Sequence, residues 1–163
     1  MNRRDLLNGA AAAGVGLVSL GVLGRTGAVS RDQGRFEIER SPAEWRRLLT
    51  PAQFDVLREE GTEAPGSSAL LKEHRHGRFG CAACDLPLFA SETKYESGTG
   101  WPSFYAPLPH AVATRTDASL LMARTEVRCR RCGGHLGHVF DDGPRPTGLR
   151  YCMNGVALTF HTA

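Results

Sequence analysis

The sequence carries no strong excess of either charge, and that absence narrows the range of its partners. Its 163 residues include 20 lysines and arginines against 17 aspartates and glutamates, a formal net charge of +3 at pH 7. Residues 1–30 hold three arginines and one aspartate, a net +2, which leaves only +1 for the rest of the chain. Nucleic-acid-binding domains and acidic lipid surfaces both call for clustered Lys and Arg. We therefore expect neither nucleic acid nor an acidic membrane surface as a partner.

The sequence also lacks an uninterrupted apolar run that would span a membrane comfortably. The uncharged run from Gly9 to Gly24 has about 16 residues, whereas a spanning helix needs about 20. It follows a pair of adjacent arginines and precedes several small residues, which is typical of a twin-arginine secretory signal. We predict a signal over 1–30, a mature domain over 31–163, export to the periplasm and no stable membrane insertion after cleavage. A retained N-terminal anchor is the alternative.

No internal repeat or low-complexity segment divides the chain, and its length suits a single domain. The 19 glycines and 9 prolines favour loops and short strands over a helical bundle. Capping signals predict short helices over 41–49 and over 50–61, the second ending at Gly61. The rest of the chain resembles short strands between turns, with strand composition at 120–127 and 156–160. We expect a mainly β, antiparallel domain with short N-terminal helices.

Four of the five cysteines form two C-x-x-C pairs, Cys81 with Cys84 and Cys129 with Cys132, with 44 residues between the pairs. Each pair can form a tight knuckle, and two knuckles can close a tetrahedral four-thiolate zinc site. Such a site has no open coordination position, so we expect one structural Zn²⁺. Two disulfides are the alternative, because an exported protein enters an oxidising compartment.

The fifth cysteine, Cys152, has no partner once the other four bind zinc. Arg150 precedes it by two residues and Asn154 follows it by two, so an extended segment would place all three side chains on one face. A cationic neighbour favours the nucleophilic thiolate, and an amide can orient a water or a ring. The alternative is a buried free cysteine that acts as a small hydrophobe.

Two histidines, His135 and His138, come directly after the second knuckle in a glycine-rich stretch that ends in two aspartates. Their position next to a metal knuckle and near carboxylates indicates acid–base or water-binding groups. The other histidines have no such context and are expected to be solvated: His74, His76, His110 and His161.

Aromatic residues framed by Gly and Pro gather over 97–105, in the sequence SGTGWPSFY, and include Trp101 and Phe104. Such a loop suits a preformed apolar pocket. Ordinary core packing is the alternative interpretation of the same composition.

Taken together, these segments resemble the methionine-R-sulfoxide reductases of the MsrB type. The resemblance runs from about Ser41 to Phe160, and GWPSF, HLGHVF and RYC-x-N in this order and spacing are its most specific motifs. It implies two antiparallel β-sheets in a tent-like arrangement and a zinc site remote from the catalytic cysteine. It also implies reduction of the R epimer of methionine sulfoxide, mainly in proteins, and so protein repair under oxidative stress.

The resemblance further implies roles for individual residues. Cys152 matches the family nucleophile, which attacks the sulfoxide sulfur and becomes a sulfenic acid. His135, His138 and Asn154 match residues that line the site, bind water and assist proton delivery. The remaining matches concern substrate contacts, with Trp101 as the wall that receives the S-methyl group, and comprise Trp101, Phe104, Arg150 and Asp142.

The chain departs from many of these relatives at Thr99, where they carry a resolving cysteine. With four cysteines assigned to zinc, no internal thiol remains to form a disulfide with Cys152. We therefore expect an external thiol, from a thioredoxin-like protein or a small molecule, to reduce the sulfenic acid. The expected partners are this reductant and oxidised proteins or peptides, and the expected state is a monomer.

Two other classes of function compete with the reductase. A zinc-ribbon binding module would need no lone cysteine and would usually show a basic or aromatic surface run. A disulfide-stapled secreted domain with a spare thiol would bind no metal at its four cysteines. The export signal and the near-neutral mature charge count against the binding module.

Overall fold

In a computed structural model, the described residues are 36–120 and 122–163, within a unit that spans Gly34–Ala163. Two short helices, α1 (Pro42–Leu48) and α2 (Pro51–Glu59), lie near the start of this part of the chain. The predicted signal over 1–30 lies outside the described residues. Within those residues, no helix combines the length and apolar character needed to cross a bilayer.

Each helix begins at a capping box, as the sequence predicts. The Ser41 hydroxyl accepts from the Glu44 amide, and the Glu44 carboxylate accepts from the Ser41 amide at 2.8 Å. Thr50 and Gln53 form the same reciprocal pair at the start of α2. The second helix ends at Glu59, two residues before the predicted end at Gly61, because Glu60 rather than Gly61 adopts the left-handed cap conformation, with φ 60°.

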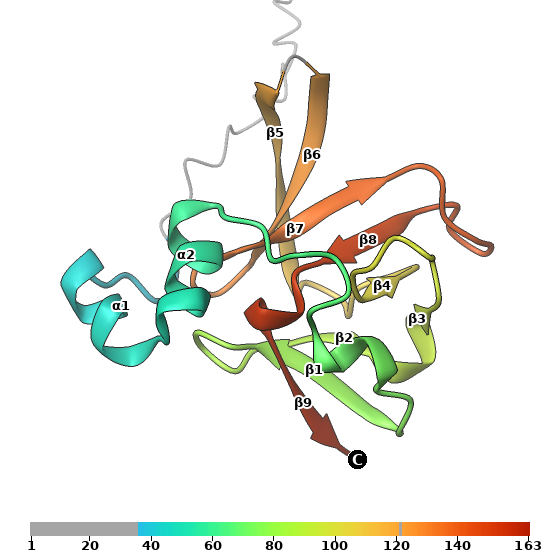
Figure 1. Ribbon diagram of the computed structural model, residues 1–163, viewed down its shortest axis with the longest axis horizontal. Coiled ribbons are helices and arrows are strands. Elements are labelled where there is room, and N and C mark those ends of the chain that lie inside the picture. The colour runs from blue at the N-terminus through green and yellow to red at the C-terminus, as the bar shows by residue number, and fades with distance from the viewer. Residues whose placement is uncertain (1–35, 121) are drawn as a thin grey trace, which may run out of the picture. The chain divides into compact units, whose positions relative to one another are not determined.

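The strands form two antiparallel sheets, which confirms the predicted fold class (Figure 1). The three-stranded sheet has the order β2–β1–β9 and the six-stranded sheet the order β3–β4–β8–β7–β6–β5. The strand bounds are β1 Gly77–Cys81, β2 Pro87–Ala90, β3 Lys94–Tyr95, β4 Ser103–Phe104, β5 Val112–Leu120, β6 Met122–Cys129, β7 His135–Phe140, β8 Arg150–Met153 and β9 Leu158–Thr162. The described residues also include three 3₁₀ turns: η1 Ala69–Lys72 before β1, η2 Ser91–Thr93 between β2 and β3, and η3 Gly155–Ala157 between β8 and β9.

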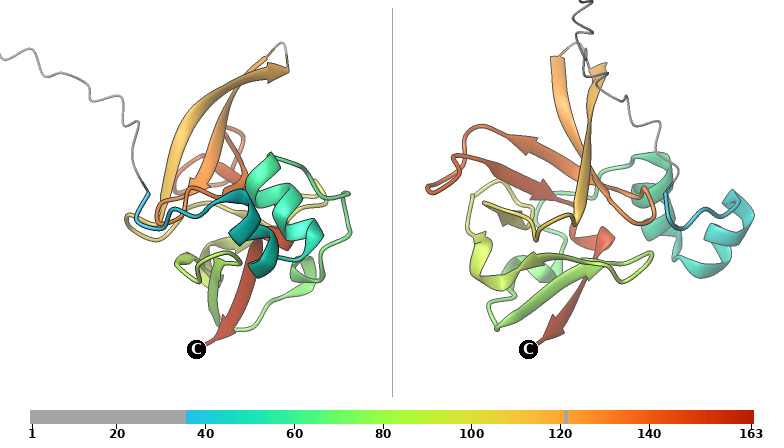
Figure 2. Two further views of the ribbon diagram at one scale, coloured as in Figure 1. Left: turned by 90° about the vertical axis from the view of Figure 1, so that its left-hand side faces the viewer. Right: turned by 180° about the vertical axis from the view of Figure 1, so that it is seen from behind.

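The strand order does not follow the chain order, and this matters for the site. β8, close to the C-terminus, lies between β4 and β7, so it joins two segments that are distant in sequence. The next strand, β9, leaves the six-stranded sheet and pairs with β1 in the other one. The hairpin of β5 and β6 extends beyond the rest of its sheet in every view (Figure 2).

The predicted strands at 120–127 and 156–160 are present but displaced toward the C-terminus. The first corresponds to β6, which continues to Cys129 and so leads directly into the second knuckle. The second begins only at Leu158, because residues 155–157 form the turn η3. Composition located the strands, whereas pairing with neighbouring strands decided their ends.

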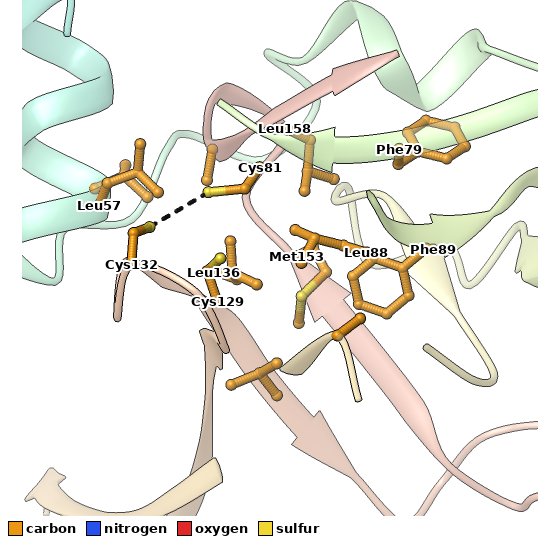
Figure 3. Packing of buried hydrophobic residues seen from close by; sticks show 14 of the residues in the cluster. Leu57, Phe79, Cys81, Leu88, Phe89, Cys129, Cys132, Leu136, Met153 and Leu158 are labelled. Carbon is orange, nitrogen blue, oxygen red and sulfur yellow. Dashed lines mark hydrogen bonds between the residues drawn. The ribbon is translucent and has the colours of Figure 1, made fainter. Parts of the chain in front are cut away.

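The hydrophobic core joins both sheets to α2 (Figure 3). Phe54, Val56 and Leu57 of α2 are buried, and Phe54 and Leu57 share one face because they are three residues apart. Figure 3 shows Leu57 beside Cys132, so the helix packs against a knuckle. The knuckle cysteines are therefore part of the same core as the aliphatic residues.

Phe104 belongs to this core and not to a substrate pocket. Its ring is fully buried, stacks on Phe89 with centroids 4.3 Å apart, and meets Phe79 edge-on at 5.0 Å. On β4 it pairs with Tyr151, whereas its neighbour Ser103 pairs with Cys152, so the two side chains of β4 point to opposite faces. The predicted contact of Phe104 with substrate does not fit this position.

Replacing Phe104 with leucine should therefore lower stability through lost packing. We expect the free energy of unfolding to fall by roughly 1–3 kcal/mol, because the aromatic contacts with Phe79 and Phe89 are lost. Urea denaturation of the two proteins measures this. Leu48→Ala is the matched control, since Leu48 is 58% exposed and its loss should change stability by less than about 0.5 kcal/mol. A change equally small in Phe104→Leu would show that the ring is not part of the core.

Candidate active site

Cys152 lies in an inner strand of the six-stranded sheet, because β8 runs between β4 and β7. Its direct cross-strand partners are Ser103 on β4 and His138 on β7. His138 is paired in turn with Glu126 on β6. Side chains of directly paired residues point to the same face of a sheet. The strand register therefore places a thiol, an imidazole and a carboxylate in one row.

Both predicted histidines lie on that face only because β7 is irregular. His135 and His138 are three residues apart, a spacing that would send them to opposite faces of a regular strand. A register shift between β6 and β7 inserts one extra residue in β7, and the two rings lie 5.4 Å apart between centroids. Gly137 occupies this shift with φ 153°, and a Cβ there would lie 2.1 Å from the Cys152 carbonyl oxygen. The close approach of β7 and β8 thus requires glycine.

A cavity of about 150 Å³ opens in front of Cys152 and is large enough for one side chain. Cys152 is partly exposed there. Four of the predicted site residues meet in this wall, and the complete lining consists of Thr62, Trp101, Arg124, Gly137, His138, Phe140, Cys152 and Asn154. His135 is not part of the wall; it lies beside His138 and is 3% exposed.

Trp101 and Asn154 are held through a common neighbour, Glu63. The Trp101 indole donates to the Glu63 carbonyl at 3.1 Å, and the Glu63 amide donates to the Asn154 side-chain oxygen at 3.0 Å. The Glu63 carboxylate accepts from the amides of Gly155 and Val156. Asn154 therefore connects the loop that carries Glu63 to the strand end after Cys152. Sequence reasoning missed Glu63, which lies in a segment without regular structure.

Asn154 also binds the sheet itself. Its side-chain nitrogen donates to the Leu136 carbonyl at 3.2 Å, and its backbone amide donates to the same oxygen at 2.8 Å. The oxygen and one N–H of the amide are thus engaged with backbone groups. The contacts of Asn154 within the chain are structural, and they fix the wall of the cavity.

Thr99 stands next to the nucleophile candidate. Its hydroxyl lies 3.7 Å from the Cys152 sulfur and 2.8 Å from the Ser97 hydroxyl. The Ser97 hydroxyl continues to the Ser103 hydroxyl at 2.7 Å. A row of three hydroxyl groups therefore ends at the Cys152 sulfur. Thr99, the last of them, occupies the position at which a cysteine side chain would lie next to that sulfur.

His135 is paired with a buried carboxylate that sequence reasoning missed. Its Nδ1 lies 2.8 Å from Glu126, whose side chain is 2% exposed, and Arg115 donates to the other carboxylate oxygen. Burial raises the pKa of Glu126, but the hydrogen bonds from His135 and Arg115 outweigh it, so the pKa is lowered overall. Glu126 is therefore held as a carboxylate inside the sheet.

His138 has a separate carboxylate, Asp117 on β5. Its Nε2 lies 2.8 Å from Asp117 Oδ2, which also accepts from Arg124 at 2.7 Å. Burial lowers the pKa of His138, and the hydrogen bond with Asp117 opposes that shift only in part. The sequence RTEVR at 124–128 could have indicated Arg124 and Glu126 as neighbours of the site. Alternate residues of a strand share a face, so this pattern places its charged side chains together.

Arg150 and Asp142 form an ion pair with each other, and neither residue lines the cavity. The guanidinium of Arg150 forms two hydrogen bonds of 2.8 Å with the Asp142 carboxylate and lies 4.3 Å above the Phe140 ring. This pairing lowers the pKa of Asp142. Because Phe140 lines the cavity, the ion pair supports that wall from behind.

The four remaining cysteines converge in one cluster, with all their sulfurs within 4.8 Å of one another. The shorter separations are between knuckles: 3.7 Å from Cys81 to Cys132, drawn in Figure 3, and 3.5 Å from Cys84 to Cys129. All five cysteines are free. This arrangement suits a shared metal ion and not a bridge inside each C-x-x-C pair.

The chemistry of this cluster also favours a cation. The thiols hydrogen-bond one another, which raises the pKa of Cys81 and Cys129 and lowers the pKa of Cys84 and Cys132. Four thiolates at these separations would repel one another strongly unless a cation stood between them. The donor set is all sulfur, which suits zinc among the common metals.

Arg58 of α2 adds a contact that the sequence did not suggest. Its guanidinium donates to the Cys132 carbonyl at 2.9 Å and to the Cys132 sulfur at 3.3 Å. The same group lies 3.8 Å above the Trp45 ring. The helix pair therefore contacts the cysteine cluster through one positively charged side chain.

The predicted solvation of the four other histidines is confirmed, since His74, His76, His110 and His161 are exposed.

The sequence of this chain is similar to those of several known proteins. The SelR domain pattern matches residues 49–162. A Leptospira interrogans protein named peptide methionine sulfoxide reductase MsrB is 53% identical over 126 residues, which are 77% of this chain and 96% of that protein. Proteins of the same name from Methanosarcina barkeri and Leifsonia xyli are 54% and 55% identical, over 77% and 78% of this chain and 89% and 94% of their own lengths.

Proposed function

The chain belongs to the SelR domain family and is a methionine sulfoxide reductase, and we propose that Cys152 is its nucleophile and the R epimer its substrate. The observation that carries this proposal is the cavity in front of Cys152, where a thiol faces an imidazole and an indole within one small hollow. The alternative of a zinc-ribbon binding module without catalysis is not favoured, because it explains neither the cavity nor the relatives.

The proposed reaction transfers one oxygen atom. The Cys152 thiolate attacks the sulfoxide sulfur and forms a transient sulfur–sulfur bond. The oxygen then moves to the cysteine sulfur while the transient bond and the sulfur–oxygen bond of the substrate break, which leaves Cys152 as a sulfenic acid and the substrate as a thioether. The substrate sulfur gains two electrons and the cysteine sulfur loses two. The thiol proton finally resides on the transferred oxygen, and in this proposal His138, the cross-strand partner of Cys152, carries it there.

Preference for one epimer follows from the two unlike walls of the cavity. Trp101 offers an apolar ring for the S-methyl group, whereas His138 offers a polar group to the oxygen. In the other epimer, methyl and oxygen exchange places. A buried polar group would then lose its hydrogen bond, at a cost of roughly 1–3 kcal/mol for each group.

Recycling uses an external thiol in this proposal. The residue that reaches the Cys152 sulfur is Thr99, whose hydroxyl cannot form a disulfide. The sulfenic acid condenses with one thiol of a thioredoxin-like or small reductant and releases water. A second thiol then resolves the mixed disulfide and restores the Cys152 thiol.

The substrate is an oxidised protein in this proposal, which makes protein repair the biological role. A larger groove of about 800 Å³ lies along α2 and β9 and shares Thr62 with the cavity of Cys152. The small cavity accommodates one methionine side chain, and the groove leaves room for the chain around it. We propose a monomer, exported through a signal over 1–30 and active in the periplasm under oxidative stress.

The metal of the four-cysteine cluster is structural Zn²⁺ in this proposal. Cys81, Cys84, Cys129 and Cys132 supply four thiolates, so the ion would complete its coordination without substrate. Zinc bound there contributes to the free energy of folding and takes no part in the oxygen transfer.

Chromatography of the two epimers of a dabsyl-methionine sulfoxide tests the reaction. Purified protein with dithiothreitol should consume the R epimer alone, and Cys152→Ser should abolish turnover because the nucleophile is lost. Arg47→Gln, at an exposed position on α1, is the control and should keep full activity. Turnover by Cys152→Ser, or equal use of both epimers, would contradict the proposal.

Thr99→Cys should change the recycling step from attack by an external thiol to formation of an internal disulfide. A thiol at the position of the Thr99 hydroxyl, 3.7 Å from the Cys152 sulfur, can attack the sulfenic acid and form an internal disulfide. Mass spectrometry after one turnover should show a loss of two hydrogens and a 99–152 cross-link in the variant, and a free sulfenic acid in the parent chain. An internal disulfide between Cys152 and a knuckle cysteine in the parent chain would refute external recycling.

Arg58→Met should weaken zinc retention, because the N–H donor to the Cys132 sulfur and the adjacent positive charge are lost. Loss of a hydrogen-bond partner of a metal ligand typically lowers metal affinity by about 10- to 100-fold. Zinc transfer to a chromophoric chelator measures the effect, with Arg46→Met as control, since Arg46 is exposed and stacks on Phe54 instead. Zinc transfer as slow as in the parent chain would show that Arg58 does not support the metal.

A further inference from the structure

The β5–β6 hairpin carries an ion pair that contacts His138. Its carboxylate comes from β5, which lies two strands from β7 in the sheet. Asp117 and Arg124 are direct cross-strand partners on this hairpin. One carboxylate oxygen, Asp117 Oδ2, accepts from the Arg124 guanidinium at 2.7 Å and lies 2.8 Å from His138 Nε2. The Asp117 side chain is only 16% exposed, so these contacts are formed largely away from solvent.

The two contacts of this carboxylate decide which ring nitrogen of His138 carries hydrogen. An ionised carboxylate can only accept, so Nε2 must donate to it. In the neutral ring, Nδ1 is then the nitrogen with a free electron pair. The adjacent His135 is bound the opposite way round, because its Nδ1 faces Glu126. The structure thus assigns the two histidines opposite tautomers.

We propose that Asp117 and Arg124 are positioning residues that hold His138 in the Nε2–H tautomer, so that Nδ1 accepts the Cys152 proton. This inference rests on the proposed function. Asp117 orients the ring and stabilises the imidazolium, whereas Arg124 holds the Asp117 carboxylate in place through its ion pair. The proton passes from the Cys152 sulfur to Nδ1 and then to the departing sulfoxide oxygen.

Arg124 has a second effect through its charge. The titratable and charged groups that face His138 come from all four strands around it and are Asp117, Arg124, Glu126, His135 and Cys152. Among them, Arg124 and His135 lower the pKa of His138, and Asp117 raises it, whereas burial is the largest cause of its lowering. Asp117 and Arg124 thus act on the same ring in opposite directions.

The opposite effects of Asp117 and Arg124 on the pKa of His138 give a test. If the two residues only stabilised the fold, their replacement would not shift this pKa in opposite directions. In the full-length, zinc-loaded chain, ¹⁵N NMR of the imidazole nitrogens reports the tautomer and the pKa of His138. Asp117→Asn should lower this pKa further and allow the Nδ1–H tautomer, because an amide can both donate and accept. Arg124→Met should raise the pKa and leave the Nε2–H tautomer in place.

Rates measured without reductant complete the test. The rate of Cys152 oxidation by R-sulfoxide in a single turnover should fall by about 10- to 100-fold in Asp117→Asn. Its pH dependence should move in the same direction as the pKa of His138 in each variant. Asp141→Asn is the matched control, since Asp141 is exposed, and it should leave tautomer, pKa and rate unchanged.

Each outcome has a definite meaning. Unchanged tautomer and pKa in Asp117→Asn, or shifts of the same sign in both variants, would overturn the inference. If Asp117→Asn does not fold, Arg124→Lys against Arg124→Met gives the same answer, because only the loss of charge should raise the pKa. Absence of reductase activity together with the expected NMR shifts would refute the proposed function and leave the positioning of His138 intact.

Discussion

The close approach of β7 to the backbone of Cys152 is the constraint on which the site depends. Gly137 makes it possible, because any Cβ there would overlap the Cys152 carbonyl oxygen. The same irregularity in β7 turns His135 and His138 to one face of the sheet. A regular strand would separate the two rings, and a larger residue would push β8 away from β7. Gly137 thus permits the close approach of β8, and the extra residue of β7 next to it, Leu136, brings His135 and His138 to one face.

The face around Cys152 contains an unusual number of buried charges, and they are stabilised in pairs. Burial alone would favour neutral Glu126, yet the contacts with His135 and Arg115 keep its pKa low. Asp117 and Arg124 form a second pair of the same kind next to His138. A buried charge is expensive unless it is paired and hydrogen-bonded. Both pairs lie next to the histidines of the site, one of which, His138, is the proposed proton carrier.

The four-cysteine cluster is part of the hydrophobic core. Cys81, Cys129 and Cys132 are buried among aliphatic residues, so the knuckles pack as core residues and also present sulfurs that could hold a metal ion. Arg58 connects this cluster to Trp45 through a cation–π contact. The second knuckle ends only three residues before His135, so the cysteine cluster adjoins the start of β7.

The sequence by itself determined the features that depend on short spacings. Capping residues located both helices, the C-x-x-C pairs indicated the metal cluster, and the lone Cys152 with its motifs indicated the reaction. Only the tertiary structure decided which distant groups meet. It placed Phe104 in the core, because neighbouring residues of β4 face opposite sides, and it brought Asp117 to His138 across two strand pairings. Strand register and a single inserted residue decide such contacts, and both depend on interactions between segments that local sequence patterns do not encode.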